Sequence, residues 1–199
     1  MFQRYAALRT ILYFGVVTIF YAIAAELART HGGYIVFMEG GFVETVQLGT
    51  ILTAGVLFVF LARKFPDQRG VLALLATVSF LACSRELNNT ETYRVLYFFP
   101  GASWVFGAVI LGFVLYKFGK DLPRQIRELL NQPACSLFVA GFFIVVGWGQ
   151  IFAQRSIFES AEVDRIVEEG LEAAGYLLIL SGAVELSYNL RDRRAAKQA

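Results

Sequence analysis

Long apolar runs alternate with short polar segments along most of this chain. A helix that crosses the ~30 Å hydrocarbon core of a bilayer needs about 20 mostly apolar residues, and six segments meet that requirement. The pattern predicts an all-α fold, a bundle of six transmembrane helices that forms one domain over residues 1–199. We expect the helices at residues of about 8–28, 42–62, 70–88, 95–117, 134–154 and 165–190.

Three of the shorter patterns add detail. Residues 31–41 place five apolar residues between two Gly pairs, too few to span, so we expect an interfacial or re-entrant turn on the outer face. Residues 117–133 mix leucines with arginines at helical spacing, which indicates a helix along the cytoplasmic surface. Within 95–117, Pro100 predicts a kink, and the i, i+4 pair Ala108 and Gly112 predicts close helix packing.

The basic residues fall unevenly between the two sides of the predicted bundle. Of the 18 Lys and Arg residues, thirteen lie on the side of the two termini. Cytoplasmic loops carry the excess of Lys and Arg, so both termini are expected in the cytoplasm and the protein in the plasma membrane, the inner membrane of a Gram-negative cell. The five residues of the opposite side are Arg29, Arg85, Arg94, Arg155 and Arg165.

Composition supports the membrane assignment and narrows the chemistry. Charged residues make up 17% of the chain, against about 25% in soluble domains, which excludes a typical cytosolic enzyme. A net charge of +2 gives no basic stripe for nucleic acid, so the expected partner is the lipid bilayer. Cys83 and Cys135 lie in apolar runs and His31 is the single histidine, so we expect neither haem nor zinc.

Glutamates of four predicted helices lie at about the same depth. Glu26, Glu44, Glu86 and Glu172 each stand about 24–28 Å from the cytoplasmic end of their helix, near the outer edge of the hydrocarbon core. Ionisable residues among apolar neighbours usually face the bundle interior and mark function. The alternative is a row of solvated residues at the membrane surface.

Nine polar residues near this level form the candidate site for a ligand or cation. Glu168 and Glu169 lie one turn before Glu172, where like charges repel and need a counter-charge from Arg85, Arg155, Arg165 or a bound cation. The nine are Glu39, Glu44, Gln47, Arg85, Glu86, Gln150, Glu168, Glu169 and Glu172.

Two pairings are predicted for charged residues of the helices. Arg85 and Glu86 are adjacent, so they are expected to point about 100° apart, which leaves Arg85 to serve Glu44 or Glu172. Glu185 lies deeper toward the cytoplasm and is expected to pair with a basic residue of that rim.

The site supports three hypotheses on function. All its ligands are oxygen donors, which suit Mg²⁺, Ca²⁺ or Mn²⁺ held by Glu44, Glu86 and Glu172, or a cationic solute. The first hypothesis is a protein that binds such a cation at the outer face, with or without moving it across the membrane. The second is a non-catalytic subunit or assembly factor of a membrane complex, with other subunits or a second copy as partner. The third is a metal-assisted enzyme for a lipid-linked substrate, although no catalytic residue can be assigned.

Overall fold

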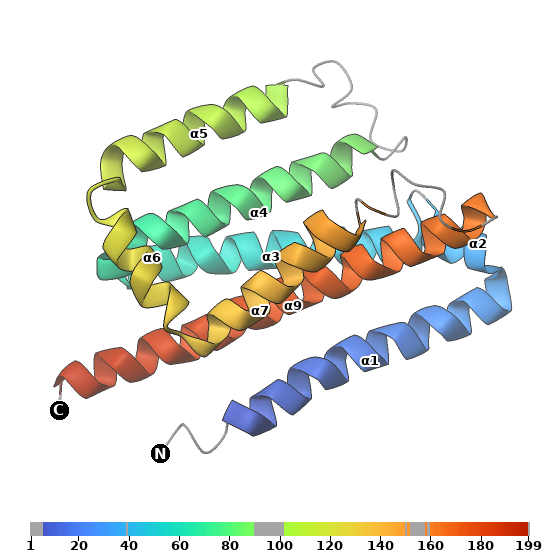
Figure 1. Cartoon of the computed structure of the whole chain (residues 1–199), viewed down its shortest axis with the longest axis horizontal. Coiled ribbons are helices and arrows are strands. Elements are labelled where there is room, and N and C mark those ends of the chain that lie inside the picture. Colours follow the sequence, from blue (N-terminus) through green and yellow to red (C-terminus); the bar gives the residue numbers. More distant parts are fainter. Residues whose placement is uncertain are drawn as a thin grey trace.

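The computed structural model describes residues 6–38, 40–89, 102–149, 151, 158 and 160–198, and every regular element among them is helical. The long helices lie lengthwise beside one another, with both termini at the same end (Figure 1). A π-helical segment, Phe143–Gly149, continues α7. The helices are α1 (Ala6–His31), α2 (Gly33–Phe37), α3 (Phe42–Lys64), α4 (Arg69–Asn89), α5 (Ala102–Phe118), α6 (Leu122–Leu130), α7 (Pro133–Phe142) and α9 (Ala161–Gln198).

Four helical stretches among the described residues are long and apolar enough to cross a membrane. A fifth exists if α6 and the stretch that follows it, which are bent by 96°, count as one span. The all-α prediction is therefore confirmed, with four or five candidate spans among the described residues, and the number of six spans is not confirmed. The four stretches are Leu8–His31, Gly33–Lys64, Pro66–Leu87 and Ala161–Ala196.

The two remaining predicted spans differ from expectation. In place of 95–117, the structure describes α5 from Ala102, and its apolar part, Val105–Phe118, is shorter than a full span. The kink predicted at Pro100 lies outside the described residues. In place of 134–154, α7 gives way to the π-helical segment after ten residues.

The connections follow from local chemistry. Gly32 and Gly40, on either side of α2, have φ angles of 94° and 76°, which favour glycine because it lacks a Cβ. The predicted helix in 117–133 is confirmed as α6, whose Leu122 and Leu129 are buried. Gln125 of α6 accepts, with its Oε1, a hydrogen bond of 2.9 Å from the main-chain N–H of Val71 in the first turn of α4. This contact satisfies one of the donors that the first turn of a helix leaves unpaired.

Helix α9 is the centre of the fold. It packs against α3 and α7, and also contacts α1 and α2, while α4 packs on α3 and α5 packs on α4. The largest apolar core lies where α3, α4 and α9 meet, around Phe58, Leu61, Leu72 and Leu186. Buried polar side chains of the three helices, Gln47 of α3, Glu86 of α4 and Glu172 of α9, also lie inside the bundle.

Close helix packing occurs at glycines other than the predicted one. A Cβ on Gly175 of α9 would lie 2.8 Å from the Gly141 oxygen of α7, so these backbones touch. The prediction for Ala108 and Gly112 is wrong, because Ala108 is exposed and a Cβ on Gly112 would meet open space. Gly107 takes that role instead, directly against Leu81 of α4. The spacing of small residues did not indicate which face of α5 turns inward.

Candidate functional site

A buried ion-pair network joins α4 to α9. Arg85 Nη2 lies 2.7 Å from Glu86 Oε1 and 2.9 Å from both carboxylate oxygens of Glu172. Tyr176 donates its hydroxyl hydrogen to the same Glu86 oxygen at 2.7 Å. The Arg85 guanidinium thus binds one carboxylate from each helix. The Tyr176 hydroxyl gives the Glu86 carboxylate a further hydrogen bond.

The helical repeat of α9 brings two of these groups to one face. Glu172 and Tyr176 are one turn apart, at i and i+4. Glu86 and Glu172 are each 4% exposed, and Tyr176 is 1% exposed. A charge at such a position is costly unless it is paired and hydrogen-bonded, so the network fixes the rotation of α9 relative to α4.

Gln47 extends the site onto α3. Its side chain is 0% exposed, and its Nε2 donates to the main-chain oxygen of Glu169 at 2.8 Å and to Glu169 Oε2 at 2.9 Å. Gln47 Oε1 accepts no hydrogen bond from the described residues. A buried acceptor without a donor costs about 1–3 kcal/mol, so this oxygen is a candidate contact for a ligand that carries N–H or O–H groups.

Two further residues of α9 complete the cluster. Arg165 Nη2 lies 3.6 Å from Glu169 Oε1, and Glu168, one turn before Glu172, lies within electrostatic range of Arg85 and Arg165. Among the described residues the cluster thus gathers several carboxylates in one place, an arrangement that attracts cations. The cluster contains Glu86, Glu168, Glu169 and Glu172 with Arg85 and Arg165.

Glu44 has a local role in the turn before α3. It is 8% exposed, and its Oε2 accepts a hydrogen bond from the Gly40 main-chain N–H. An acid in the first turn of a helix that reaches back in this way stabilises the helix start. Two other members of the predicted site, Glu39 and Gln150, lie outside the described residues.

The metal prediction for Glu44, Glu86 and Glu172 gains no geometric support. Within the part of the chain that the structure describes, no group of three or more His, Cys, Asp or Glu side chains is arranged to hold a metal ion. A divalent cation at these residues stays a prediction.

One expectation about Arg85 is wrong and the other is confirmed. Arg85 contacts its neighbour Glu86, although their Cβ atoms leave the helix about 100° apart. The guanidinium, at the end of a long side chain, swings sideways around the helix and closes that gap. The expected pairing of Arg85 with Glu172 is confirmed.

Tyr176 belongs to the network as a hydrogen-bond donor and was not predicted from the sequence. Its position four residues after Glu172 was the available signal, since residues at that spacing share a helix face. In the sequence, a tyrosine among leucines resembles an ordinary core residue.

A second ion pair lies at the opposite end of α9. Arg9 of α1 approaches Glu185 with Nε at 2.7 Å and Nη2 at 2.9 Å, and Tyr13 donates to the same carboxylate at 2.9 Å. The Arg9 guanidinium also lies 5.3 Å from the centre of the Tyr188 ring. The predicted pairing of Glu185 with a basic residue at that rim is confirmed, and it attaches α1 to α9.

Comparison of the chain with models of protein families, with curated sequences and with solved structures finds no match.

Proposed function

We propose that this protein is a polytopic membrane protein that binds a cationic solute at the carboxylate network of α3, α4 and α9. The observation that carries the proposal is the buried acceptor Gln47 Oε1, which accepts no hydrogen bond from the described residues and belongs to the amide that contacts the Glu169 carboxylate. A cation with N–H donors supplies a hydrogen for the amide oxygen, and the neighbouring carboxylates attract its positive charge.

Several features favour an ammonium or guanidinium group over a bare metal ion. Glu169 and Gln47 are already hydrogen-bonded, so a ligand approaches one amide oxygen and the remaining lone pairs of a carboxylate. One amide oxygen and a few carboxylate lone pairs suit a ligand with directional N–H donors. A hard divalent ion instead takes six or more oxygen ligands around one centre.

The proposed arrangement in the membrane has six spans, with both termini in the cytoplasm of a plasma membrane. The excess of basic residues on the side of the termini supports it, as does the position of both termini at one end of the bundle (Figure 1). Helices α5 and α7 then supply the fourth and fifth crossings along the chain, and α9 the sixth. In this orientation the carboxylate network lies toward the outer face.

Thermal unfolding of the purified chain in detergent tests the binding proposal. A ligand that binds only the folded state raises its stability as its concentration rises, by about 2.7 kcal/mol at a hundredfold excess over Kd. We expect methylammonium to raise the midpoint, and Mg²⁺, Ca²⁺ and Mn²⁺ to leave it unchanged at equal ionic strength. A rise with a divalent ion alone would favour the metal hypothesis instead.

Matched variants separate the site from general charge effects. Glu169→Gln removes one carboxylate of the cluster and should abolish the ligand-dependent rise. Glu162→Gln, at an exposed position in the first turn of α9, makes the same chemical change away from the network and should preserve it. If the ligand raised the unfolding midpoint of both variants equally, Glu169 would not belong to the binding site.

A second candidate, a subunit of a membrane complex, is favoured by α1. Most large apolar side chains of this helix are exposed, among them Ile11, Phe14 and Ile19, so α1 presents a broad surface to lipid or to another subunit. Extraction in a mild detergent followed by mass measurement distinguishes the candidates. A complex that contains a different protein supports the subunit role.

A further inference from the structure

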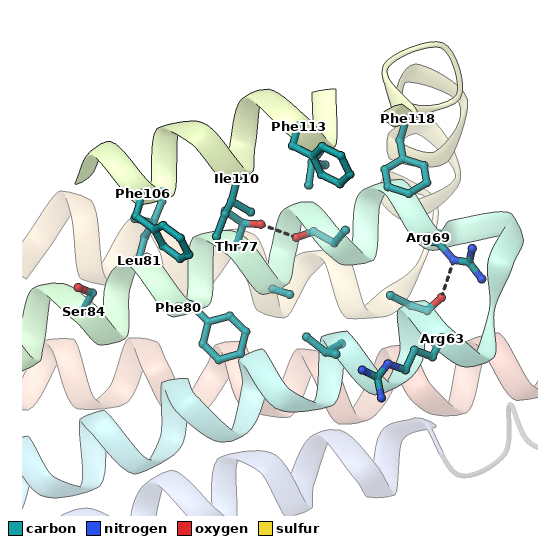
Figure 2. A pocket seen from close by; sticks show the side chains of 16 residues that line it. Arg63, Arg69, Thr77, Phe80, Leu81, Ser84, Phe106, Ile110, Phe113 and Phe118 are labelled. Carbon is teal, nitrogen blue, oxygen red and sulfur yellow. Dashed lines mark hydrogen bonds between the residues drawn. The ribbon is translucent and has the colours of Figure 1, made fainter. Parts of the chain in front are cut away.

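An apolar groove lies between α5 and the α3–α4 pair, away from the carboxylate network. Its volume is about 520 Å³, within the range of small-molecule sites. Leu81 of α4 lies on the side of Phe106 and Ile110 of α5, while Phe80 of α4 turns toward α3, and all four line the groove (Figure 2). Thr77, a polar residue of the wall, donates its hydroxyl hydrogen to the Ala73 main-chain oxygen, so the wall presents little but hydrocarbon.

Close contacts between α5 and α4 border the groove along its length. Near one end, Gly107 lies directly against Leu81, and near the other a Cβ on Gly70 would lie 2.8 Å from Phe118 Cβ. The two helices therefore touch at two points and separate between them. This separation makes a defined slot rather than the open flank of a single helix.

Two arginines stand at the end of the groove where α3 passes into α4. Arg63 lies in the last turn of α3 and Arg69 at the first residue of α4 (Figure 2). Arg69 Nε donates to the Ala62 main-chain oxygen at 3.2 Å, and Arg63 makes no ion pair with the described residues. None of the described lining residues is acidic, so both positive charges are left for an outside anion.

We propose that the groove holds one acyl chain of an anionic glycerophospholipid, with the lipid phosphate on Arg63 and Arg69. From Arg69 to Ser84 the wall extends about 22 Å along α4, longer than the ~15 Å that half of the hydrocarbon core occupies. The slot thus accommodates a chain from one leaflet. Guanidinium groups bind phosphate through paired N–H donors, and basic residues beside helices at the cytoplasmic surface attract anionic lipids.

Native mass spectrometry of the full chain in detergent, with added lipids of identical acyl chains, tests the assignment. We expect one phosphatidylglycerol to stay bound under conditions that remove phosphatidylcholine. The double variant Arg63→Gln, Arg69→Gln should lower this headgroup preference about 25-fold, since each arginine that contacts the phosphate contributes about fivefold. Ala73→Phe, which fills the slot from α4, should reduce retention of both lipids.

Arg127→Gln is the matched control. It removes one exposed arginine from α6, outside the groove lining, and should leave the preference unchanged. The proposal is overturned if the double variant keeps the preference of the unmodified chain, or if Arg127→Gln lowers it equally. Displacement of phosphatidylglycerol by an equimolar polyprenyl phosphate would overturn the assignment to a glycerophospholipid. If a folded Ala73→Phe variant retained both lipids as well as the unmodified protein does, the placement of the acyl chain in the groove would be wrong.

Discussion

At the scale of single residues, Arg85 offers the clearest test of the network. Its guanidinium bonds to Glu86 and Glu172, two buried carboxylates that repel each other without it. Replacement of one partner in a buried ion pair leaves the other charge uncompensated and costs about 3–5 kcal/mol. We therefore expect Arg85→Ala to lower the free energy of unfolding by that amount, measured by titration with SDS from a mild detergent.

The loss of stability in Arg85→Ala should arise from the buried carboxylates of Glu86 and Glu172 rather than from the missing arginine itself. A triple variant, Arg85→Ala with Glu86→Gln and Glu172→Gln, should recover much of the stability, because neutral amides need no counter-charge. Arg29→Ala breaks an exposed pair with Glu26 and should leave the unfolding midpoint in place. If Arg85→Ala behaved like Arg29→Ala, the network would not hold α4 to α9.

At the scale of whole helices, the contact between α7 and α9 depends on paired glycines. A Cβ on Gly175 would lie 2.8 Å from the Gly141 oxygen, and one on Gly141 would lie 2.6 Å from the Gly175 oxygen. Overpacking of this kind costs about 1–3 kcal/mol, so Gly175→Ala should destabilise the fold by that amount in the same titration.

Gly112→Ala is the matched control on α5. Open space surrounds the position that its Cβ would take, and alanine favours a helix over glycine by about 0.5–1 kcal/mol. This variant should be neutral or slightly more stable. Equal destabilisation by both substitutions would mean that helix interiors tolerate no change here, and that the α7–α9 contact has no special role.

At the scale of the whole molecule, the position of each terminus tests the proposed topology. Alkaline phosphatase is active only outside the cytoplasm, so a fusion after Ala199 should be inactive in a Gram-negative host. The same enzyme inserted after Gly32, in the turn between α1 and α2, should be active. Activity of the C-terminal fusion would overturn the cytoplasmic placement.

The course of the helices was largely evident from the order of residues. Apolar runs that end at Arg63-Lys64 and begin at Gly70 placed α3 and α4 within two residues of their observed bounds. A basic partner for Glu185 was expected, although not Arg9 in particular, because an acid within a membrane helix near basic residues of the cytoplasmic side needs a counter-charge.

Contacts across helices depend on how each helix is rotated, which the sequence leaves open. The apolar residues of α9 are distributed around much of its circumference, so no pattern indicated that Tyr176 and Glu172 face α4. The hydrogen bond from Gln47 to Glu169 joins residues far apart in the chain, and it required the packing of α3 on α9. The face of α5 that turns inward was misjudged for the same reason.

The two ion pairs of α9 limit how this helix can move. Glu172 and Glu185 are separated by about 20 Å along the axis and by about 140° around it, so α4 and α1 hold the helix from nearly opposite sides. A screw step by one residue would turn both carboxylates by about 100° and break both attachments together. Together with the packing of α9 on α3 and α7, the two pairs therefore fix both the rotation of the central helix and its position along its axis.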